Sequence, residues 1–248
     1  MYLARNGIDG KLQSVDGVKT EMWIDESIAT TRAGKEVIRE FKEELAKIKI
    51  AKGGDSFSFR GSENGEKNQI YYLADAVFGK GAAQRGTLYE AVTGIGKTTT
   101  LIPAIAALKT RITGKPVVII LNTPTDVADF FNATKGEFYT KLGLKAFEFD
   151  NNTFTPAKSA ELAGADIIVT TKDAIFESIK GDTGKPFISK ARNSVLLADE
   201  AQNTLRLEID YVITHGGRQT LGQMGEQGRL RIGIFTDVLE GATLKGIR

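Results

Sequence analysis

Residues 87–108 read TLYEAVTGIGKTTTLIPAIAAL, and this stretch decides how the chain is expected to fold. An apolar run suited to a strand (87–92) leads into GIGKT at 94–98, and a helical pattern follows. Glycines let successive backbone N–H groups face one anion, and a helix N-terminus adds partial positive charge. The stretch therefore predicts a phosphate-binding loop, in which Lys97 reaches the β- and γ-phosphates of a nucleotide and Thr98 offers its hydroxyl to Mg²⁺.

The loop predicts a set of site residues. Those expected to bind the nucleotide are Thr93, Gly94, Ile95, Gly96, Lys97, Thr98 and Thr99. Lys97 is also expected to take part in catalysis, because its positive charge would lie beside the transferred phosphoryl group.

From Gln69 onward, apolar runs alternate with helical segments, which is typical of a parallel sheet built from strand-helix-strand units. The expected strands are 87–92, 116–121, 146–149, 166–170, 194–198 and 230–235. The expected helices between them are 98–108, 125–131, 156–162 and 174–179. Runs such as VVIIL and VLLA suit strands covered on both faces. We predict an α/β fold with a mostly parallel sheet flanked by helices.

The first 66 residues have a different pattern. Apolar side chains recur at helical spacing between residues 28 and 49, which predicts one amphipathic helix that packs on the core. The stretch 53–68, rich in Gly, Ser and Asn, predicts a loop or linker. We therefore expect an N-terminal helical extension over 1–66 and a nucleotide-binding domain over 67–248.

Composition excludes several kinds of site. The 248 residues carry 33 Lys and Arg against 31 Asp and Glu, so the net charge of +2 gives no general attraction to nucleic acid. Without Cys, and with His215 as the single histidine, the chain has no disulfide, thiolate metal site or histidine-rich metal centre. It also lacks a secretory signal and a membrane-spanning run, so we expect a cytoplasmic location.

A second motif lies about a hundred residues after the phosphate loop. Residues 194–200 read SVLLADE, a buried strand that ends in two acids. In a parallel sheet the carboxyl ends of strands share one edge, so Asp199 and Lys97 are expected to converge. We assign Asp199 to Mg²⁺ and Glu200 to the hydrolytic water, as general base or orienting group.

The two motifs resemble those of a known protein family. Asp199-Glu200-Ala201-Gln202 resembles the DEAD or DEAH box of superfamily 2 helicases, and 91–98 matches their motif I, A-x-x-G-x-G-K-T. Residues 122–128, NTPTDVA, resemble motif Ia with Asp126 in place of its arginine, and 170–172 stand where motif Ib would lie. Gln69 corresponds to the adenine-reading glutamine upstream of motif I.

The resemblance implies a RecA-like ATPase domain, covering roughly residues 67–204, that uses ATP and Mg²⁺. It implies contact with DNA or RNA through the regions of Thr125 and Thr170. Motifs IV to VI are not found, so we expect a second RecA-like domain in cis or in trans, and slow hydrolysis without it. Two alternatives stay open: a protein-translocating ATPase resembling SecA, and a scaffold that binds nucleotide without hydrolysing it.

Overall fold

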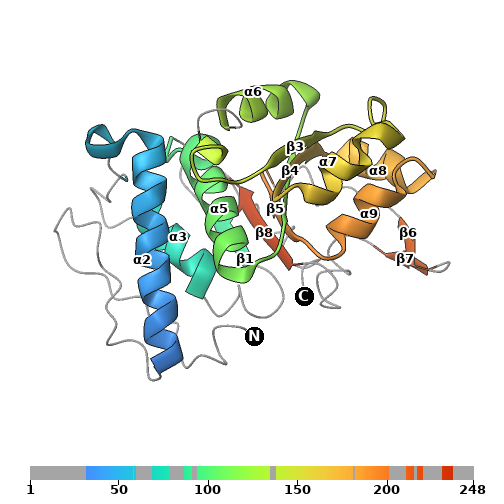
Figure 1. The fold of residues 1–248 in the computed structure, drawn as a ribbon. Helices are drawn as coiled ribbons and strands as arrows, with labels where there is room; N and C mark the ends of the chain where they lie inside the picture. The colour runs from blue at the N-terminus through green and yellow to red at the C-terminus, as the bar shows by residue number, and fades with distance from the viewer. Residues whose placement is uncertain are drawn as a thin grey trace.

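The computed structural model describes residues 32–57, 59, 69–78, 87–90, 94–134, 138–180, 182–200, 211–214, 217–219 and 231–236. Its centre is a six-stranded sheet with the strand order β1-β8-β5-β2-β4-β3, and every neighbouring pair is parallel (Figure 1). The strands are β1 (Thr87–Glu90), β2 (Val117–Leu121), β3 (Ala146–Phe149), β4 (Ile167–Thr171), β5 (Val195–Ala198) and β8 (Arg231–Thr236). A separate antiparallel pair consists of β6 (Tyr211–Thr214) and β7 (Gly217–Gln219).

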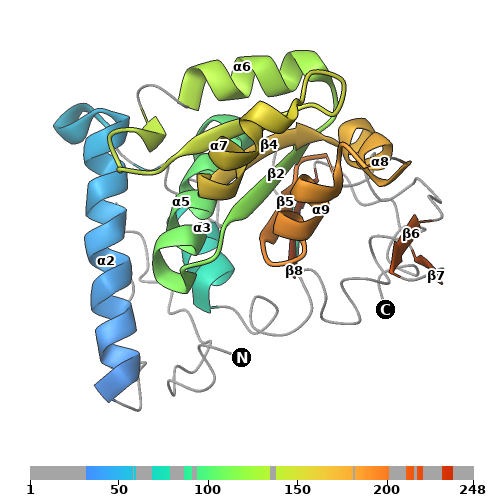
Figure 2. The same cartoon turned by 45° about the vertical axis from the view of Figure 1, so that its right-hand side comes forward.

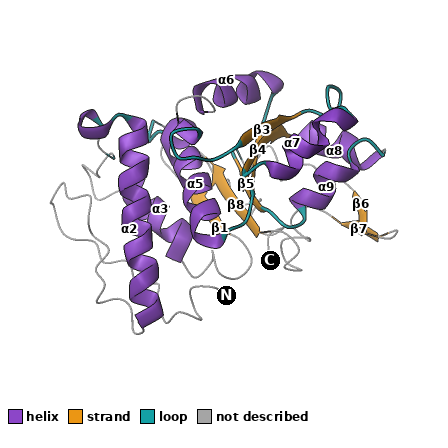
Figure 3. Ribbon diagram, viewed as in Figure 1, coloured by secondary structure: helices purple, strands orange, loops and turns teal. Residues whose placement is uncertain are grey.

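Helices cover both faces of the sheet (Figures 2 and 3). They are α2 (Arg32–Lys52), α3 (Gln69–Phe78), α5 (Ile102–Thr113), α6 (Pro124–Thr134), α7 (Ser159–Gly164), α8 (Lys172–Lys180) and α9 (Lys185–Ala191). Side chains alternate along a strand, so β2 sends Val117 and Ile119 into the cluster with α2, α3 and α5 and Val118 into the cluster with α7, α8 and α9. Burial on two faces explains why these strands are apolar throughout.

The predicted fold class is confirmed. All six expected strands are present in one parallel sheet, with ends within two residues of those expected. Helices α6 and α8 lie over the expected segments. The segment 156–162 begins as a short 3₁₀ turn, Pro156–Lys158, before α7. Helix α2 confirms the amphipathic helix, although residues 28–31 lie outside the described part. The pattern did not predict α3, α9 or the β6–β7 pair.

The prediction of one regular helix over 98–108 is wrong in its first turn. Lys97–Leu101 forms a π-helical turn, with the Leu101 N–H donating to Gly96 O at 3.0 Å, and α5 begins only at Ile102. Pro103 lies directly after this turn, and it cannot donate in the regular i to i−4 ladder because a proline has no N–H. The widened turn is the segment that follows the phosphate loop.

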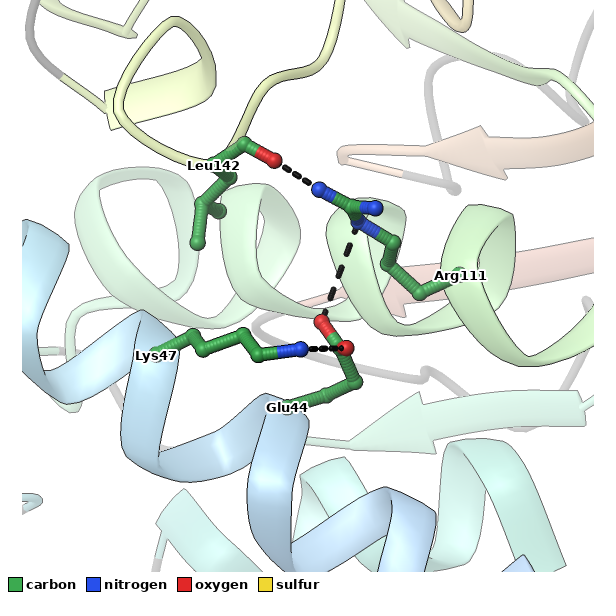
Figure 4. A network of polar contacts seen from close by, with 4 residues as sticks. All are labelled: Glu44, Lys47, Arg111 and Leu142. Carbon is green, nitrogen blue, oxygen red and sulfur yellow. Dashed lines mark hydrogen bonds and ion pairs between the residues drawn. The ribbon is translucent and has the colours of Figure 1, made fainter.

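Helix α2 is integrated into the core, and its Val37, Ile38 and Phe41 belong to the same apolar cluster as α5 and β2. The domain boundary expected at residue 66 stays a prediction, since residues 60–68 lie outside the described part. A polar network also joins α2 to α5 (Figure 4). Glu44, only 8% exposed, accepts from Lys47 Nζ at 2.5 Å and lies 3.8 Å from Arg111 Nε. Arg111 donates in turn to Leu142 O.

Replacing Glu44 by alanine is expected to lower the free energy of unfolding by about 1–2 kcal/mol, since the two cations lose a buried, charged acceptor. The measurement is chemical denaturation, with Glu36→Ala as the matched control. Glu36 pairs with Arg32 at 3.2 Å on the same helix, but its side chain is 55% exposed. Its loss should cost less than about 0.5 kcal/mol. Equal effects of the two substitutions would contradict the assigned role of the Glu44 network.

Candidate functional site

The phosphate loop contains two glycines with left-handed backbone. Gly94 has φ 84° and Gly96 has φ 82°, a region that other residues rarely adopt. A Cβ on Gly96 would also lie 3.2 Å from Gln69 Nε2. The glycines of the sequence motif are therefore required by the backbone turn that leads into the π-helical segment.

Thr98 contacts Asp199 at the carboxyl edge of the sheet. Thr98 Oγ1 donates to Asp199 Oδ2 at 2.8 Å, although 101 positions separate the two residues. Asp199 follows β5, and its own N–H donates to Ile120 O of the neighbouring strand at 3.0 Å. The adjacent Lys97 is 8% exposed. The structure thus brings together Lys97, Thr98 and Asp199, as the sequence predicted.

Glu200 has an unusual backbone conformation. Its φ is +48°, and it is the only residue other than glycine with positive φ in the described part of the chain. Such a conformation costs an L-residue with a Cβ roughly 1–2 kcal/mol. The Glu200 N–H donates to Asp199 Oδ1 at 3.0 Å, so the turn places both carboxylates at the end of β5.

These side chains line a cavity of about 450 Å³. Thr98, Asp199 and Glu200 contribute to its wall together with Asn122, which follows β2. Asn122 Oδ1 is buried, and among the described residues it has no hydrogen-bond partner. A buried acceptor of this kind requires a donor, which a water or a metal-bound water would supply.

The donor set fits Mg²⁺ and the phosphates of a nucleotide. A hydroxyl and a carboxylate oxygen, with Asn122 Oδ1 beside them, are the hard ligands that Mg²⁺ takes while it keeps several waters. The described residues contain no group of three or more His, Cys, Asp or Glu that could hold a metal unaided.

Burial raises the pKa of the Asp199 carboxyl above its ordinary value. The hydrogen bond from Thr98 opposes this shift, and the neighbouring Glu200 carboxylate adds to it. In the folded, nucleotide-free protein the negative charge on Asp199 is therefore unfavourable. A bound cation would relieve this cost, as expected of a metal-binding carboxylate.

Two further nucleotide-site predictions have different outcomes. Gln69 is 2% exposed at the start of α3, and its Nε2 donates to Ile95 O at 2.6 Å. Its side chain thus braces the phosphate loop, while reading of adenine stays a prediction. Thr93 lies outside the described residues. Thr99 is exposed and lines the same cavity as Thr98.

The expected nucleic-acid segments lie at the carboxyl ends of the neighbouring strands β2 and β4. Thr125 is exposed in the first turn of α6. Asp126, which replaces the motif Ia arginine, accepts from the N–H and hydroxyl of Thr123 and donates its own N–H to Thr123 Oγ1. This capping box begins α6 and explains the acid at that position.

The Thr170 side chain does not reach the surface. It is fully buried, and its hydroxyl donates to Phe149 O at 2.8 Å. Thr171 Oγ1 accepts from the Ala174 N–H and so begins α8. Of the segment 170–172, the half-buried Lys172 is therefore the residue with a side chain available to a polymer.

Sequence reasoning missed Lys52. It is the last residue of α2, yet its side chain lines the cavity with Thr98 and Asp199. No motif marks it, since a lysine near the end of a helix is ordinary. Its place in the site follows only from how α2 packs against α5.

Among the described residues no helix is long and apolar enough to cross a membrane.

Comparison with known proteins gives one family. The model of the DEAD/DEAH box helicase family matches residues 69–224. No curated protein matches the chain. Among solved structures, the chain is similar to a hypothetical ATP-dependent RNA helicase from Sulfolobus tokodaii, with 18% identity, a TM-score of 0.48, and coverage of 81% of this chain and 53% of that one. The chain thus spans about half the length of that protein.

Replacing Asp199 by asparagine is expected to stabilise the nucleotide-free protein at neutral pH. A carboxyl whose pKa is raised by folding contributes stability below its unfolded pKa, and that contribution is lost as pH rises through the folded pKa. The neutral amide avoids the loss. We expect the Tm to rise by about 2–4 °C.

The measurement is thermal unfolding without nucleotide or metal, at pH 7 and again in mild acid, where the difference between the two proteins should shrink. Asp129→Asn is the control, because Asp129 lines the same cavity but is exposed. A lower Tm for Asp199→Asn at pH 7 would show that the buried negative charge of Asp199 does not destabilise the fold.

Proposed function

Because the chain belongs to the DEAD/DEAH box helicase family, we propose that the phosphate loop and the end of β5 form an ATP-hydrolysing site that drives movement on nucleic acid. The hydrogen bond from Thr98 to Asp199 at 2.8 Å carries the proposal, because it joins the phosphate loop to the acidic motif at the end of β5. Phosphoryl transfer relies on positioning and charge, and both require these groups to be adjacent.

Each residue has a distinct role in this proposal. Lys97 and the N–H groups that begin the helical turn would bind the β- and γ-phosphates of ATP. Thr98 and Asp199 would hold Mg²⁺, which neutralises phosphate charge when bound. Glu200 would orient a water and accept its proton as the water oxygen attacks the γ-phosphorus. The bond to the bridging oxygen breaks, and ADP leaves with the electron pair.

Nucleic acid would bind beside this site. Thr125 on α6 and Lys172 on α8 follow the adjacent strands β2 and β4, so both lie at the carboxyl edge of the sheet. Contacts of this kind to the phosphate backbone carry no base sequence. A second RecA-like domain, in cis or in trans, would supply the arginine that raises turnover by about 10³–10⁵. The cytoplasmic location stays a prediction.

The proposal is tested by ATP turnover without polymer and with single-stranded DNA, duplex DNA or RNA. Glu200→Gln is expected to lower turnover by about 10²–10⁴ while ATP still binds, since the proton acceptor is lost and the phosphate loop is intact. Lys97→Ala should abolish both. Glu148→Gln, an exposed carboxylate on the edge strand β3, should leave turnover unchanged.

The outcomes separate the proposed function from its alternatives. Stimulation by one nucleic acid, lost in Lys97→Ala, supports the nucleic-acid motor and identifies its track. Turnover that no nucleic acid changes would point instead to a motor acting on polypeptide. Binding of ATP with no turnover above that of Glu200→Gln would make the chain a nucleotide-binding scaffold.

A further inference from the structure

Helix α2 ends beside the phosphate loop. Its last residue, Lys52, extends across to the π-helical turn, where Nζ donates to Thr99 O at 2.5 Å. The two residues are 47 positions apart, so the contact depends on tertiary packing. Lys52 lies outside residues 69–224, the part of the chain that the family model matches, whereas Thr99 lies inside it.

The accepting carbonyl lies four residues before a proline. In a regular α-helix, the carbonyl of Thr99 accepts from the N–H of residue 103. That residue is Pro103, which has no N–H. The lysine ammonium therefore gives this carbonyl a donor other than the N–H that residue 103 would supply in a regular α-helix. Charge-assisted hydrogen bonds of this kind are stronger than those between neutral groups.

The ammonium of Lys52 is held from a second side. Nζ lies 4.7 Å from the centroid of the Phe138 ring, a cation–π distance, and Phe138 is itself 3% exposed. Burial lowers the pKa of Lys52. Helix α2 is itself held against α5, because the Glu44 network joins it to Arg111. Lys52 is thus anchored both at its helix and at its charged end.

The anchored carbonyl is next to the metal-binding hydroxyl of the proposed site. Thr99 directly follows Thr98, whose hydroxyl meets Asp199. Lys52 also lines the cavity that Thr98, Asp199 and Glu200 share. Fixing Thr99 O fixes the turn that presents the Thr98 hydroxyl and the preceding N–H groups to a nucleotide.

We propose that Lys52 is a positioning residue of the nucleotide site, through which α2 holds the first turn after the phosphate loop. The inference rests on the proposed function, because it deepens the account of the same site. Lys52 orders groups that bind phosphate in the ground state and in the transition state alike. Its loss should therefore raise KM for ATP and leave kcat nearly unchanged.

Two substitutions test the role. Lys52→Met keeps an unbranched side chain to pack beside Phe138 and removes the donor, whereas Lys52→Arg keeps a donor and a charge. Lys42→Met is the matched control on the same helix, more than two turns earlier. Thermal unfolding first establishes that each variant is folded.

The first measurement is amide hydrogen exchange in the nucleotide-free protein. The N–H groups of Thr100 and Leu101 donate to Gly96 O at 2.9 and 3.0 Å and report the turn directly. In Lys52→Met we expect them to exchange about tenfold faster, with partial rescue in Lys52→Arg and no change in Lys42→Met. Unchanged exchange in Lys52→Met would overturn the proposal.

The second measurement is steady-state ATP turnover. KM should rise by about five- to tenfold in Lys52→Met, with kcat within about twofold of the parent. A fall in kcat without a change in KM would overturn the positioning role, since it would place Lys52 among the groups that act on the transition state. If the parent protein has no turnover, the proposed function fails, and the exchange experiment still decides whether Lys52 holds the turn.

Discussion

The hydrogen bond from Thr98 to Asp199 is possible only because every strand of the main sheet runs in the same direction. Parallel strands end at one edge, so loops that are far apart in the chain meet there. Parallel connections also require crossovers, and helices on both faces provide them. The apolar strands, the two helical layers and the polar edge are thus consequences of one arrangement.

Much of this arrangement could be predicted because its causes are local. Strands buried on both faces must be apolar, and runs such as VVIIL show that directly. The phosphate loop needs glycine where φ is positive, at Gly94 and Gly96. Strand order was not predictable, because the position of β8 between β1 and β5 depends on pairing between segments about 30 to 150 residues away.

The missed features depend on tertiary contacts. Thr170 looked available to a partner, but the sheet buries it and Phe149 O takes its hydroxyl. Asp126 replaces the arginine of motif Ia, and only the structure shows that it caps α6. The π-helical turn lies between the glycine loop and Pro103, and the apolar pattern of 98–108 does not indicate it. Lys52 has a role only because α2 packs where it does, and the pattern of α2 alone does not indicate that place.

The position of β8 has a consequence for how the chain folds. Within the described residues, β1 pairs with β8 alone, so the strand that leads into the phosphate loop joins the sheet only through residues 231–236. During synthesis, some 140 residues must emerge after β1 before its partner exists. A fragment ending at residue 224, where the family match stops, would leave β1 unpaired. The nucleotide site is therefore among the last parts of the domain to be completed.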